Sequence, residues 1–311
     1  MEITKPLDLD ETAIFTLEMH SFLNVLSVLS GILQYFQMQP GCDGYFDNPV
    51  EKIHALSDAV NANDKEHVSP QAIIELKEDI LNSLNRFRTE QPEYGEGGEF
   101  EELTEPLDEV LAVLDVRVEE LKSRSEDPEA WIFIDKDEYL HEFHHFFLAV
   151  QKNSLGRYRI IHNLADQRSN DYLVNLRIDS DLNGMIPLKI LLKDVVRDVV
   201  SNARKYTPPG GKINVGISLS KGTLRFVCED SGIGIPADEI EKVIGYTYRA
   251  SNVDGKIRTM GNGSGLTKAW YVVQQLDGRM WIDSEVGSGT RITVEVPVPK
   301  TVLQQALSIA S

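Results

Sequence analysis

The chain has 311 residues, of which 41% are hydrophobic and 8% aromatic, and its formal net charge is −18. This composition excludes a disordered chain, because it supplies enough apolar side chains to build cores, and the length favours two domains. An acidic surface repels nucleic-acid phosphates, so we expect no nucleic-acid partner.

Cysteine content and hydropathy indicate where the protein works. Two cysteines, Cys42 and Cys228, lie far apart without zinc-site spacing, which suits a reducing compartment. No run of about 18 or more apolar residues is present, so no membrane span is expected. The first residues lack the basic and apolar regions of a signal peptide. We expect a cytoplasmic protein whose signal comes from an upstream sensor protein or from its own N-terminal half.

Residues 11–38 predict one amphipathic helix, which Asp10 or Thr12 can cap and which Pro40-Gly41 ends. Its apolar side chains recur at alternating steps of four and three residues, a pattern typical of a coiled coil or helix bundle. The seam consists of Phe15, Met19, Phe22, Leu26, Leu29, Leu33 and Phe36.

The rest of the first half is also expected to be helical. Helices are predicted at about 50–62, 69–88, 105–124 and 136–166, with an acidic, glycine-rich loop at 90–102. Residues 1–172 are therefore expected to form a helical dimerisation bundle, with an insertion of unknown role at about 40–130. Helix 11–38 is expected to pair with helix 136–166 within a homodimer.

From residue 173 onward, strand-like runs alternate with helical ones. The expected strands are LVNLRI, KINVGISL, LRFVCED, RMWIDSEV and RITVEVPV, and the expected helices cover about 187–206, 236–244 and 264–276. This alternation predicts an α/β sandwich with a mixed sheet over 173–300, followed by a tail at 301–311. The predicted fold class is α+β, a helical bundle followed by an α/β sandwich.

Four short motifs follow one another in this second half, each weak alone. They are DVVSNARKY with Asp198, Asn202, Lys205 and Tyr206; EDSGIGI with Asp230, Gly232 and Gly234; GNGSGL with Gly261, Gly263, Gly265 and Leu266; and GSGT with Thr290. Their chemistry suits a nucleotide. The side-chain carbonyl of Asn202 can bind Mg²⁺, which prefers oxygen ligands. Lys205 can reach phosphate oxygens, and Tyr206 can pack on adenine.

The later motifs complete such a site. The Asp230 carboxylate can accept a hydrogen bond from the adenine amino group, with Thr290 nearby, while the neighbouring glycines allow close backbone approach. The GNGSGL loop leads into a helix, and a helix N-terminus with backbone N–H groups binds anions. Between them lies a polar segment that we interpret as a mobile lid over the triphosphate, with Arg249, Lys256 and Arg258 as its cations.

In this order, the motifs make about 120 C-terminal residues resemble the catalytic ATP-binding domain of histidine kinases, part of the superfamily that includes gyrase, Hsp90 and MutL. The resemblance implies ATP and Mg²⁺ as cofactors. One departure is Asp198, where many members have a second Asn. An acidic residue there is similar to the superfamily's ATPases and some kinase subfamilies, where it orients a water or tunes Mg²⁺. Asp198 and Asn202 share a helix face, and whether Asp198 is a base or a supporting group stays open.

A second resemblance lies on the first helix. The segment MHSFLNVLSVLSGILQYF is similar to the H box of citrate- and fumarate-sensing kinases and of sporulation phosphotransferases. It implies that His20 accepts the phosphoryl group and that Asn24, one turn away, orients a water for dephosphorylating a partner. Those boxes carry Asp or Glu directly after the histidine, where this chain has Ser21, so the balance of kinase and phosphatase activity stays open.

Other histidines offer an alternative to His20. The group contains His141, His144, His145 and His162, and the spacing of the first and third of these suits a metal, although no further ligand pattern supports one. Core or polar histidines are the alternative for this group, and a chain without any phosphohistidine is a third possibility.

The sequence thus predicts a protein-histidine kinase that phosphorylates His20 from ATP and exchanges the phosphoryl group with the receiver domain of a response regulator. One alternative is a serine/threonine kinase of the same superfamily, resembling pyruvate dehydrogenase kinases. Another is a phosphotransfer or regulatory scaffold without catalysis.

Overall fold

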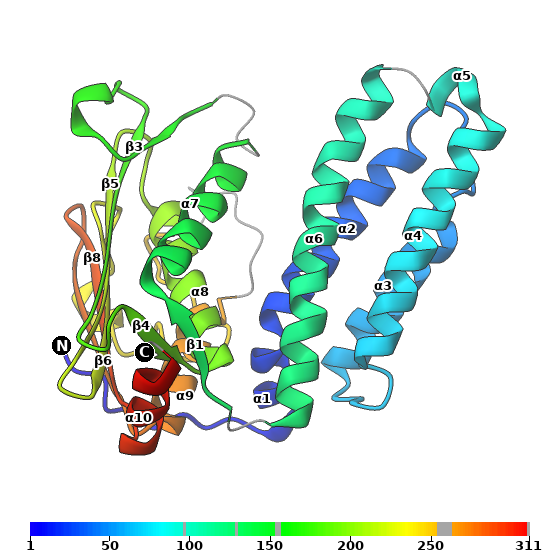
Figure 1. Cartoon of the computed structure of the whole chain (residues 1–311). Coiled ribbons are helices and arrows are strands. Elements are labelled where there is room, and N and C mark those ends of the chain that lie inside the picture. The colour runs from blue at the N-terminus through cyan, green and yellow to red at the C-terminus, as the bar shows by residue number, and fades with distance from the viewer. Residues whose placement is uncertain (96–97, 128–129, 153–156, 254–262, 310–311) are drawn as a thin grey trace. The chain divides into compact units, whose positions relative to one another are not determined.

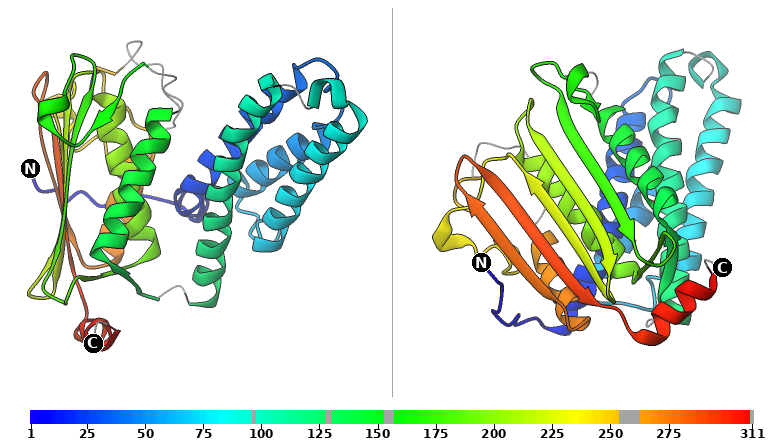
Figure 2. Two further views of the ribbon diagram at one scale, coloured as in Figure 1. Left: turned by 45° about the horizontal axis from the view of Figure 1, so that its top comes forward. Right: turned by 60° about the vertical axis from the view of Figure 1, so that its left-hand side comes forward.

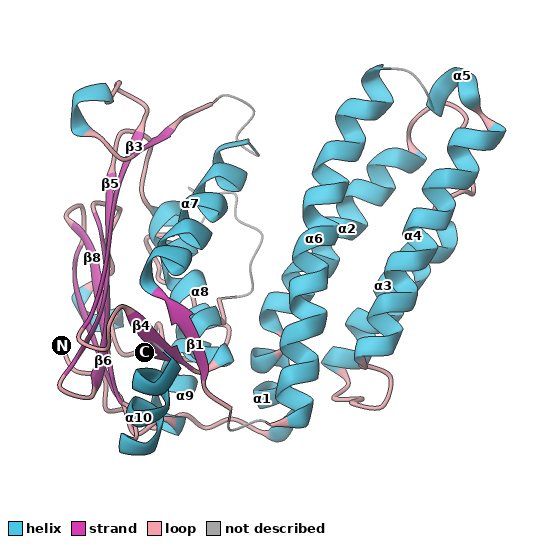
Figure 3. Cartoon of the chain, in the orientation of Figure 1, coloured by secondary structure: helices cyan, strands magenta, loops and turns pink. Residues whose placement is uncertain are grey.

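The computed structural model describes residues 1–95, 98–127, 130–152, 157–253 and 263–309. The chain divides into two compact units: unit 1 comprises Met1–Asp8 and Trp131–Ser311, and unit 2 comprises Leu9–Ala130. The units thus divide at Ala130 and Trp131, whereas the sequence places a boundary near residue 172. The predicted class, helices followed by an α/β domain with a mixed sheet, is confirmed (Figure 1, Figure 3).

Unit 2 is helical throughout its described secondary structure. Its elements are α1 (Glu11–Glu18), α2 (His20–Gln37), α3 (Asp47–Asn61), α4 (Pro70–Glu90), α5 (Pro92–Gly95) and α6 (Gly98–Glu126). The long helices α2, α3, α4 and α6 contact one another in a closed ring and enclose one apolar core. The predicted seam of α2 lies in that core, with Leu26, Leu29 and Leu33 fully buried. Residues 40–130 therefore supply three of the four long helices that close around the seam.

The predicted helix 11–38 is broken at Met19, and α1 and α2 meet there at 62°. Asp10 caps α1 by accepting a hydrogen bond from the Ala13 N–H at 2.7 Å. One turn before the break, the Thr16 hydroxyl donates to the Thr12 carbonyl, a bond that often bends helices. No single described helix has the length and apolar composition of a membrane span, although α1 and α2 taken together do.

The acidic segment 90–102, predicted as a loop, is helical in its described residues except Gln91, and residues 96 and 97 lie outside the described part. It contains α5 and the start of α6. Phe100 is 4% exposed and packs its ring 5.2 Å from Phe36 and 4.8 Å from Phe87. This aromatic contact draws the segment onto the bundle, which its acidic, glycine-rich composition does not reveal.

Unit 1 contains a six-stranded mixed sheet in the order β2-β3-β5-β6-β8-β7. Strands β2, β3 and β5 are parallel, and the other neighbours are antiparallel. The strands are β2 (Ile160–Ile161), β3 (Tyr172–Ser180), β5 (Lys212–Ser220), β6 (Thr223–Asp230), β7 (Arg279–Glu285) and β8 (Gly289–Pro297). All five predicted strands are confirmed. Exposure alternates along β5 and β6, as expected for a sheet with one covered face.

Three helices cover that face: α7 (Lys136–Lys152), α8 (Ile190–Tyr206) and α9 (Gly265–Gln275) (Figure 2). A small antiparallel pair, β1 (Ile132–Asp135) with β4 (Met185–Leu188), precedes α8. The predicted helix 136–166 ends earlier than expected, at Lys152, and packs on β1, β2 and β3. Its pairing with helix 11–38, which belongs to the other unit, stays a prediction. The predicted helix 236–244 is only a 3₁₀ turn, η2 (Ala237–Glu239), and a second such turn is η1 (Leu164–Asp166).

Both ends of the chain join unit 1. The Met1 amino group donates to the Ile282 carbonyl, and Glu2 pairs with Trp281 beside β7. The predicted tail contains helix α10 (Lys300–Ile309), whose Val302 and Ala306 are buried in the unit 1 core. Unit 1 is therefore built from chain segments on both sides of unit 2.

Candidate nucleotide and phosphoacceptor sites

Helix α8 presents a row of polar side chains at four-residue spacing, Asp194, Asp198 and Asn202. Residues at this spacing lie one above another on the same face. The buried apolar residues of the same helix, among them Val195 and Val199, hold α8 on the sheet. The helix ends at Tyr206, because Thr207 is extended and two prolines follow. Lys205 and Tyr206 therefore occupy the last turn, as predicted.

Asp230 is the last residue of β6, where it pairs in register with Thr290 of β8. Its Oδ1 accepts a hydrogen bond from the Gly232 N–H at 2.8 Å. Burial raises the pKa of Asp230 from 3.8 to about 6, although the N–H groups of Gly232 and Thr290 oppose the shift by stabilising the carboxylate. A half-buried acceptor of this kind favours a ligand that donates a hydrogen bond, as the adenine amino group does.

The loop after β6 joins Asp230 to the end of α8. The Ile233 N–H donates to the Tyr206 carbonyl at 3.1 Å. A side chain at Gly232 would place its Cβ 2.6 Å from both the Asp230 carboxylate and that same carbonyl. At Gly234, φ is +68° and an added Cβ would meet the Glu285 carbonyl at 2.0 Å, so only glycine fits. These contacts bring the first and second motifs together.

Lys205 lies in a cluster of cations with Arg204 and Arg249. Burial, together with the positive charges of Arg249 and Arg204, lowers the pKa of Lys205 from 10.5 to about 8. Among the described residues, no carboxylate lies within ion-pair distance of its ammonium group, which instead lies 5.3 Å from the centre of the Tyr206 ring. Burial also raises the pKa of the Tyr206 hydroxyl. Partly buried cations without a counter-ion fit a phosphate group.

The third motif opens α9. Gly265 and Leu266 are its first two residues, and Gly263, at φ +78°, stands just before them. The Asn202 Nδ2 atom lies 3.1 Å from where a Cβ on Gly265 would be. The start of α9 therefore lies directly against the proposed Mg²⁺ ligand. Gly261, Lys256 and Arg258 fall outside the described residues, so the predicted lid is represented by Arg249 alone.

Two charged residues of this region were not singled out from the sequence. Lys268, on α9, is completely buried, and Asp194 is 5% exposed. The signals that point to them are the continuation of the Asp198–Asn202 spacing back to Asp194, and a lysine inside an otherwise apolar helix.

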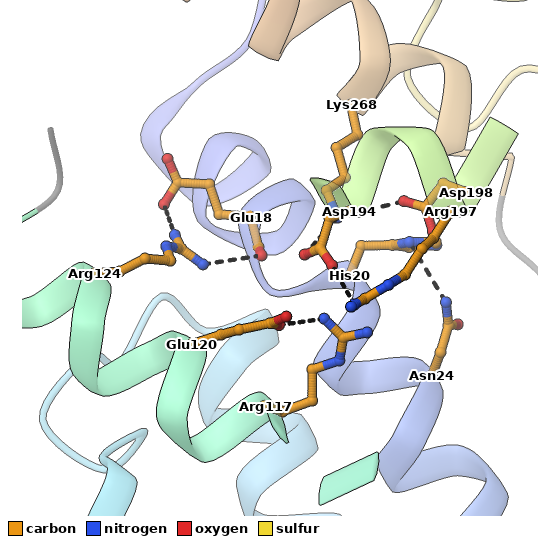
Figure 4. A network of polar contacts seen from close by, with 10 residues as sticks. All are labelled: Glu18, His20, Asn24, Arg117, Glu120, Arg124, Asp194, Arg197, Asp198 and Lys268. Atoms are coloured by element: carbon orange, nitrogen blue, oxygen red, sulfur yellow. Dashed lines mark hydrogen bonds and ion pairs between the residues drawn. The ribbon is translucent and has the colours of Figure 1, made fainter. Parts of the chain in front are cut away.

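In unit 2, His20 is the first residue of α2, and its Nδ1 lies 3.5 Å from Asn24 Nδ2. Amide oxygen and nitrogen atoms are nearly indistinguishable in shape, so either atom of Asn24 can face the ring. Arg124 of α6 holds the end of α1 just before His20, donating to the Glu18 carboxylate at 2.9 Å and to its carbonyl (Figure 4). His20 thus lies at a fixed bend, next to a helix N-terminus that favours negative charge.

The four histidines considered as alternatives to His20 lie in unit 1. The Nε2 atoms of His141 and His145 on α7 are 2.8 Å apart, and the His144 ring lies 4.7 Å from that of His162. Burial and the neighbouring rings lower the pKa of His144. Among the described residues, no group of three or more metal-ligating side chains occurs. The predicted pairing of His141 with His145 is present, but without a third ligand.

Comparison with known proteins now bears on this geometry. Residues 188–300 match the family model of the histidine kinase-, DNA gyrase B- and HSP90-like ATPases. We refer to this matched region as the ATPase-like domain. This ATPase-like domain begins at the end of β4 and includes α8, Asp230, α9 and Thr290.

Several curated histidine kinases are similar to the chain. Histidine protein kinase DivJ of Caulobacter vibrioides is 27% identical over 272 residues, which cover 80% of this chain and 43% of DivJ. Sensor histidine kinase WalK of Bacillus subtilis is 38% identical over 111 residues, 34% of this chain and 18% of WalK. The chain therefore spans less than half the length of these relatives.

Among solved structures, the catalytic domain of histidine kinase ThkA is similar, with 18% identity and a TM-score of 0.40. The match covers 55% of this chain and 99% of the ThkA chain. It adds no further evidence to the match of the ATPase-like domain with its family.

Proposed function

We propose that this chain is a protein-histidine kinase that binds ATP with Mg²⁺ in the ATPase-like domain and phosphorylates His20. The observation that carries the nucleotide site is the joining of the half-buried Asp230 acceptor to the Lys205 cation cluster through the contact between Ile233 and Tyr206. Asp230 would hold adenine, and Lys205 would hold phosphate. Asn202 would supply a carbonyl oxygen to Mg²⁺, which neutralises phosphate charge when bound.

Two observations support histidine as the acceptor. The similarity to DivJ covers more of this chain than unit 1 contains, so it extends into unit 2. His20 begins α2, where the N–H groups of the first turn favour an added phosphoryl group.

In the proposed reaction, a ring nitrogen of His20 forms a bond to the γ-phosphorus. The bond from that phosphorus to its bridging oxygen breaks, ADP leaves, and the imidazole proton passes to a base. Ser21 follows His20, so no carboxylate is adjacent in sequence to take that proton, and we expect slow autophosphorylation. The aspartate of a response regulator then takes the phosphoryl group from His20.

Asn24 has a separate proposed role. Its amide lies within reach of the His20 ring, and an amide there can orient a water against the phosphoryl group of a docked regulator. Replacing Asn24 with Ala should slow dephosphorylation of the regulator and leave its phosphorylation intact. Equal dephosphorylation rates in both proteins would contradict this role.

The same helix face offers a docking stripe for the regulator, defined here as Asn24, Ser27, Val28, Gly31 and Tyr35. All five are exposed. A Cβ at Gly31 would meet nothing within 4 Å, so the face is open there. Gly31→Arg should keep autophosphorylation and stop transfer to the regulator, whereas Gly31→Ala should keep both. Transfer at the normal rate in Gly31→Arg would contradict docking on this stripe.

A homodimer is part of the proposal, but its contacts differ from those expected. The seam of α2 is buried within the chain against α3, α4 and α6, so a second copy would contact other surfaces. Sedimentation of the full chain measures this directly, and a monomer at all concentrations would contradict the dimer.

The kinase proposal is tested by incubating the full chain with γ-labelled ATP. We expect label that is labile in acid and stable in base, lost in His20→Ala and retained in the control His54→Ala, an exposed histidine of the same unit. Label that persists in His20→Ala would exclude His20. Acid-stable label on a partner protein would favour the serine/threonine kinase, and absence of ATP binding would favour the scaffold.

A further inference from the structure

Lys268 is one of the largest completely buried side chains in the described structure. It lies on α9, one turn after Gly265. An ammonium group in an apolar interior is strongly disfavoured unless it is paired. Its Nζ atom lies 3.3 Å from Asp194 Oδ2 and 3.3 Å from Asp198 Oδ2, so two carboxylates provide that pairing (Figure 4).

Both carboxylates come from α8. Asp194 also accepts a hydrogen bond from Arg197 Nη1 at 3.4 Å through its other oxygen. The charges therefore alternate along the row Arg197, Asp194, Lys268 and Asp198, and they sum to zero. We refer to Asp194, Asp198 and Lys268 as the buried triad.

The buried triad continues a contact that begins at the nucleotide site. At the start of α9, Asn202 Nδ2 approaches the Gly265 backbone so closely that a Cβ there would lie 3.1 Å away. One turn further along α9, Lys268 meets Asp198, which lies one turn before Asn202 on α8. The two helices thus have two successive contacts, one at the proposed phosphate and metal groups and one directly behind it.

We propose, building on the proposed ATP site, that Lys268 is a positioning residue of that site. Its ammonium group, held by Asp194 and Asp198, fixes α9 against α8. It thereby sets the distance between the Asn202 carbonyl and the N–H groups that open α9. It also engages one oxygen of Asp198 from the interior, so Asp198 acts as an oriented group behind Asn202.

Stability alone does not account for the buried triad. Replacing buried ion pairs with well-packed apolar side chains is often neutral or stabilising, because charges lose their hydration on burial. An apolar residue at 268 would fill the same space. What a charged triad adds is a fixed distance and direction between two helices, and these two helices carry the metal ligand and the phosphate-binding N-terminus.

The test compares two ligands in the full chain by isothermal titration calorimetry: adenosine, which needs only the Asp230 end of the site, and ATP with Mg²⁺. In Lys268→Met we expect affinity for MgATP to fall about 10- to 100-fold, as for other residues that orient a metal ligand. We expect adenosine affinity to stay within about twofold, since Asp230 ends β6, whereas the triad lies on α8 and α9.

A second variant guards against misfolding. Lys268→Met combined with Asp194→Asn removes one positive and one negative charge together, so the charges that remain in the row, on Arg197 and Asp198, still sum to zero, and we expect the same split between ligands. Val294→Ala serves as the matched control, because Val294 is a buried apolar residue of β8, whereas the triad lies on α8 and α9. It should lose stability while binding both ligands normally.

Equal losses for both ligands in the Lys268 variants, or no loss for either, would overturn the positioning role. In that case the wild-type protein would still bind adenosine and MgATP, so the result would not contradict the proposed ATP site. Wild type that binds neither ligand would overturn the ATP site itself, and with it the role of Lys268.

Discussion

The two units bury different kinds of side chain. In the described part of unit 2, the buried polar residues are Thr16 and Thr104, and no charged side chain is buried there. In its described residues, unit 1 buries six charged side chains: Asp171, Lys189, Lys193, Asp194, Glu239 and Lys268. Buried charges are costly unless they are paired, whereas apolar packing stabilises without such requirements. The core of unit 2 is thus built from apolar packing. Unit 1 also buries charged side chains, whose desolvation cost is accepted where the position of the charge matters.

Net charge divides just as unevenly. Residues 9–130 contain 27 Asp and Glu against 8 Lys and Arg, a net charge of −19, and the remaining residues contain 22 against 23. The acidic character of the whole chain therefore belongs to unit 2. The proposed ATP site lies in a unit that is nearly neutral. The net charge of that unit therefore adds little repulsion to the phosphates that its local cations would bind.

The largest expected effect tests whether the units are independent. Leu29 is completely buried in the unit 2 core, so Leu29→Ala should reduce the free energy of unfolding of unit 2 by about 2–5 kcal/mol. Denaturant unfolding followed by helix content measures the loss. Binding of MgATP to unit 1 should not change. A parallel loss of nucleotide affinity would show that the two units are coupled.

The next effect concerns a charge held in unit 1. The pKa of Asp230 is raised from 3.8 to about 6, so the folded protein holds this proton more tightly than the unfolded chain. That contribution to stability is present below pH 3.8 and is lost as the pH rises to about 6. Asp230→Asn should therefore raise the free energy of unfolding of unit 1 at pH 7 by about 1–3 kcal/mol.

The matching control is the pH profile of the same variant. Between pH 4 and pH 6, wild-type stability should decline relative to Asp230→Asn, and above about pH 6.5 the difference should be constant. A variant less stable than wild type at pH 7 would mean that the Asp230 carboxylate is well stabilised in the free protein, contrary to its raised pKa.

The sequence predicts much of unit 1 because its signals are local. Alternating strands, the proline stop after Tyr206 and the glycines near Asp230 each act within a few residues, and the structure has them as expected. It predicts less of unit 2, since Phe100 joins the core through rings 64 and 13 residues away in the chain. The break at Met19 leaves no mark in the apolar periodicity, which continues through it.

Lys268 shows why part of the candidate site was missed. From the sequence, a lysine in a helix is expected on the solvated face. In the structure Lys268 is buried, and its ammonium group pairs with Asp194 and Asp198. The Asn202, Asp230 and glycine positions were predicted because they carry a family resemblance, as Asp198 does. Lys268 and Asp194 carry none.

A smaller effect sharpens the electrostatic side of the comparison. The pKa of Lys205 is lowered to about 8, so part of this group is neutral at pH 8.5. A bound triphosphate favours the charged form, and binding should therefore take up a fraction of a proton. Calorimetry at pH 8.5 in two buffers of different ionisation enthalpy detects this uptake. Lys205→Met should abolish it, and equal binding heats in the wild type would contradict the prediction.

The smallest effect is expected on the surface of unit 2. Lys77 of α4 donates to both carboxylate oxygens of Asp115 on α6, at 2.7 and 2.6 Å, but the Asp115 side chain is 54% exposed. Such pairs contribute about 0–1 kcal/mol. Lys77→Met should change the denaturation midpoint of unit 2 little, especially in high salt. A loss as large as that in Leu29→Ala would contradict the view that packing alone stabilises unit 2.

The central claim, that Asp230 and the α8 cations form an ATP site, is tested most directly by calorimetric titration of the full chain with MgATP. We predict saturable binding of one nucleotide per chain in wild type. In Asp230→Ala we predict affinity about 10- to 150-fold weaker, the loss expected for a hydrogen bond to a charged group, with the fold retained. Unchanged affinity in Asp230→Ala, or no binding to wild type, would contradict the account.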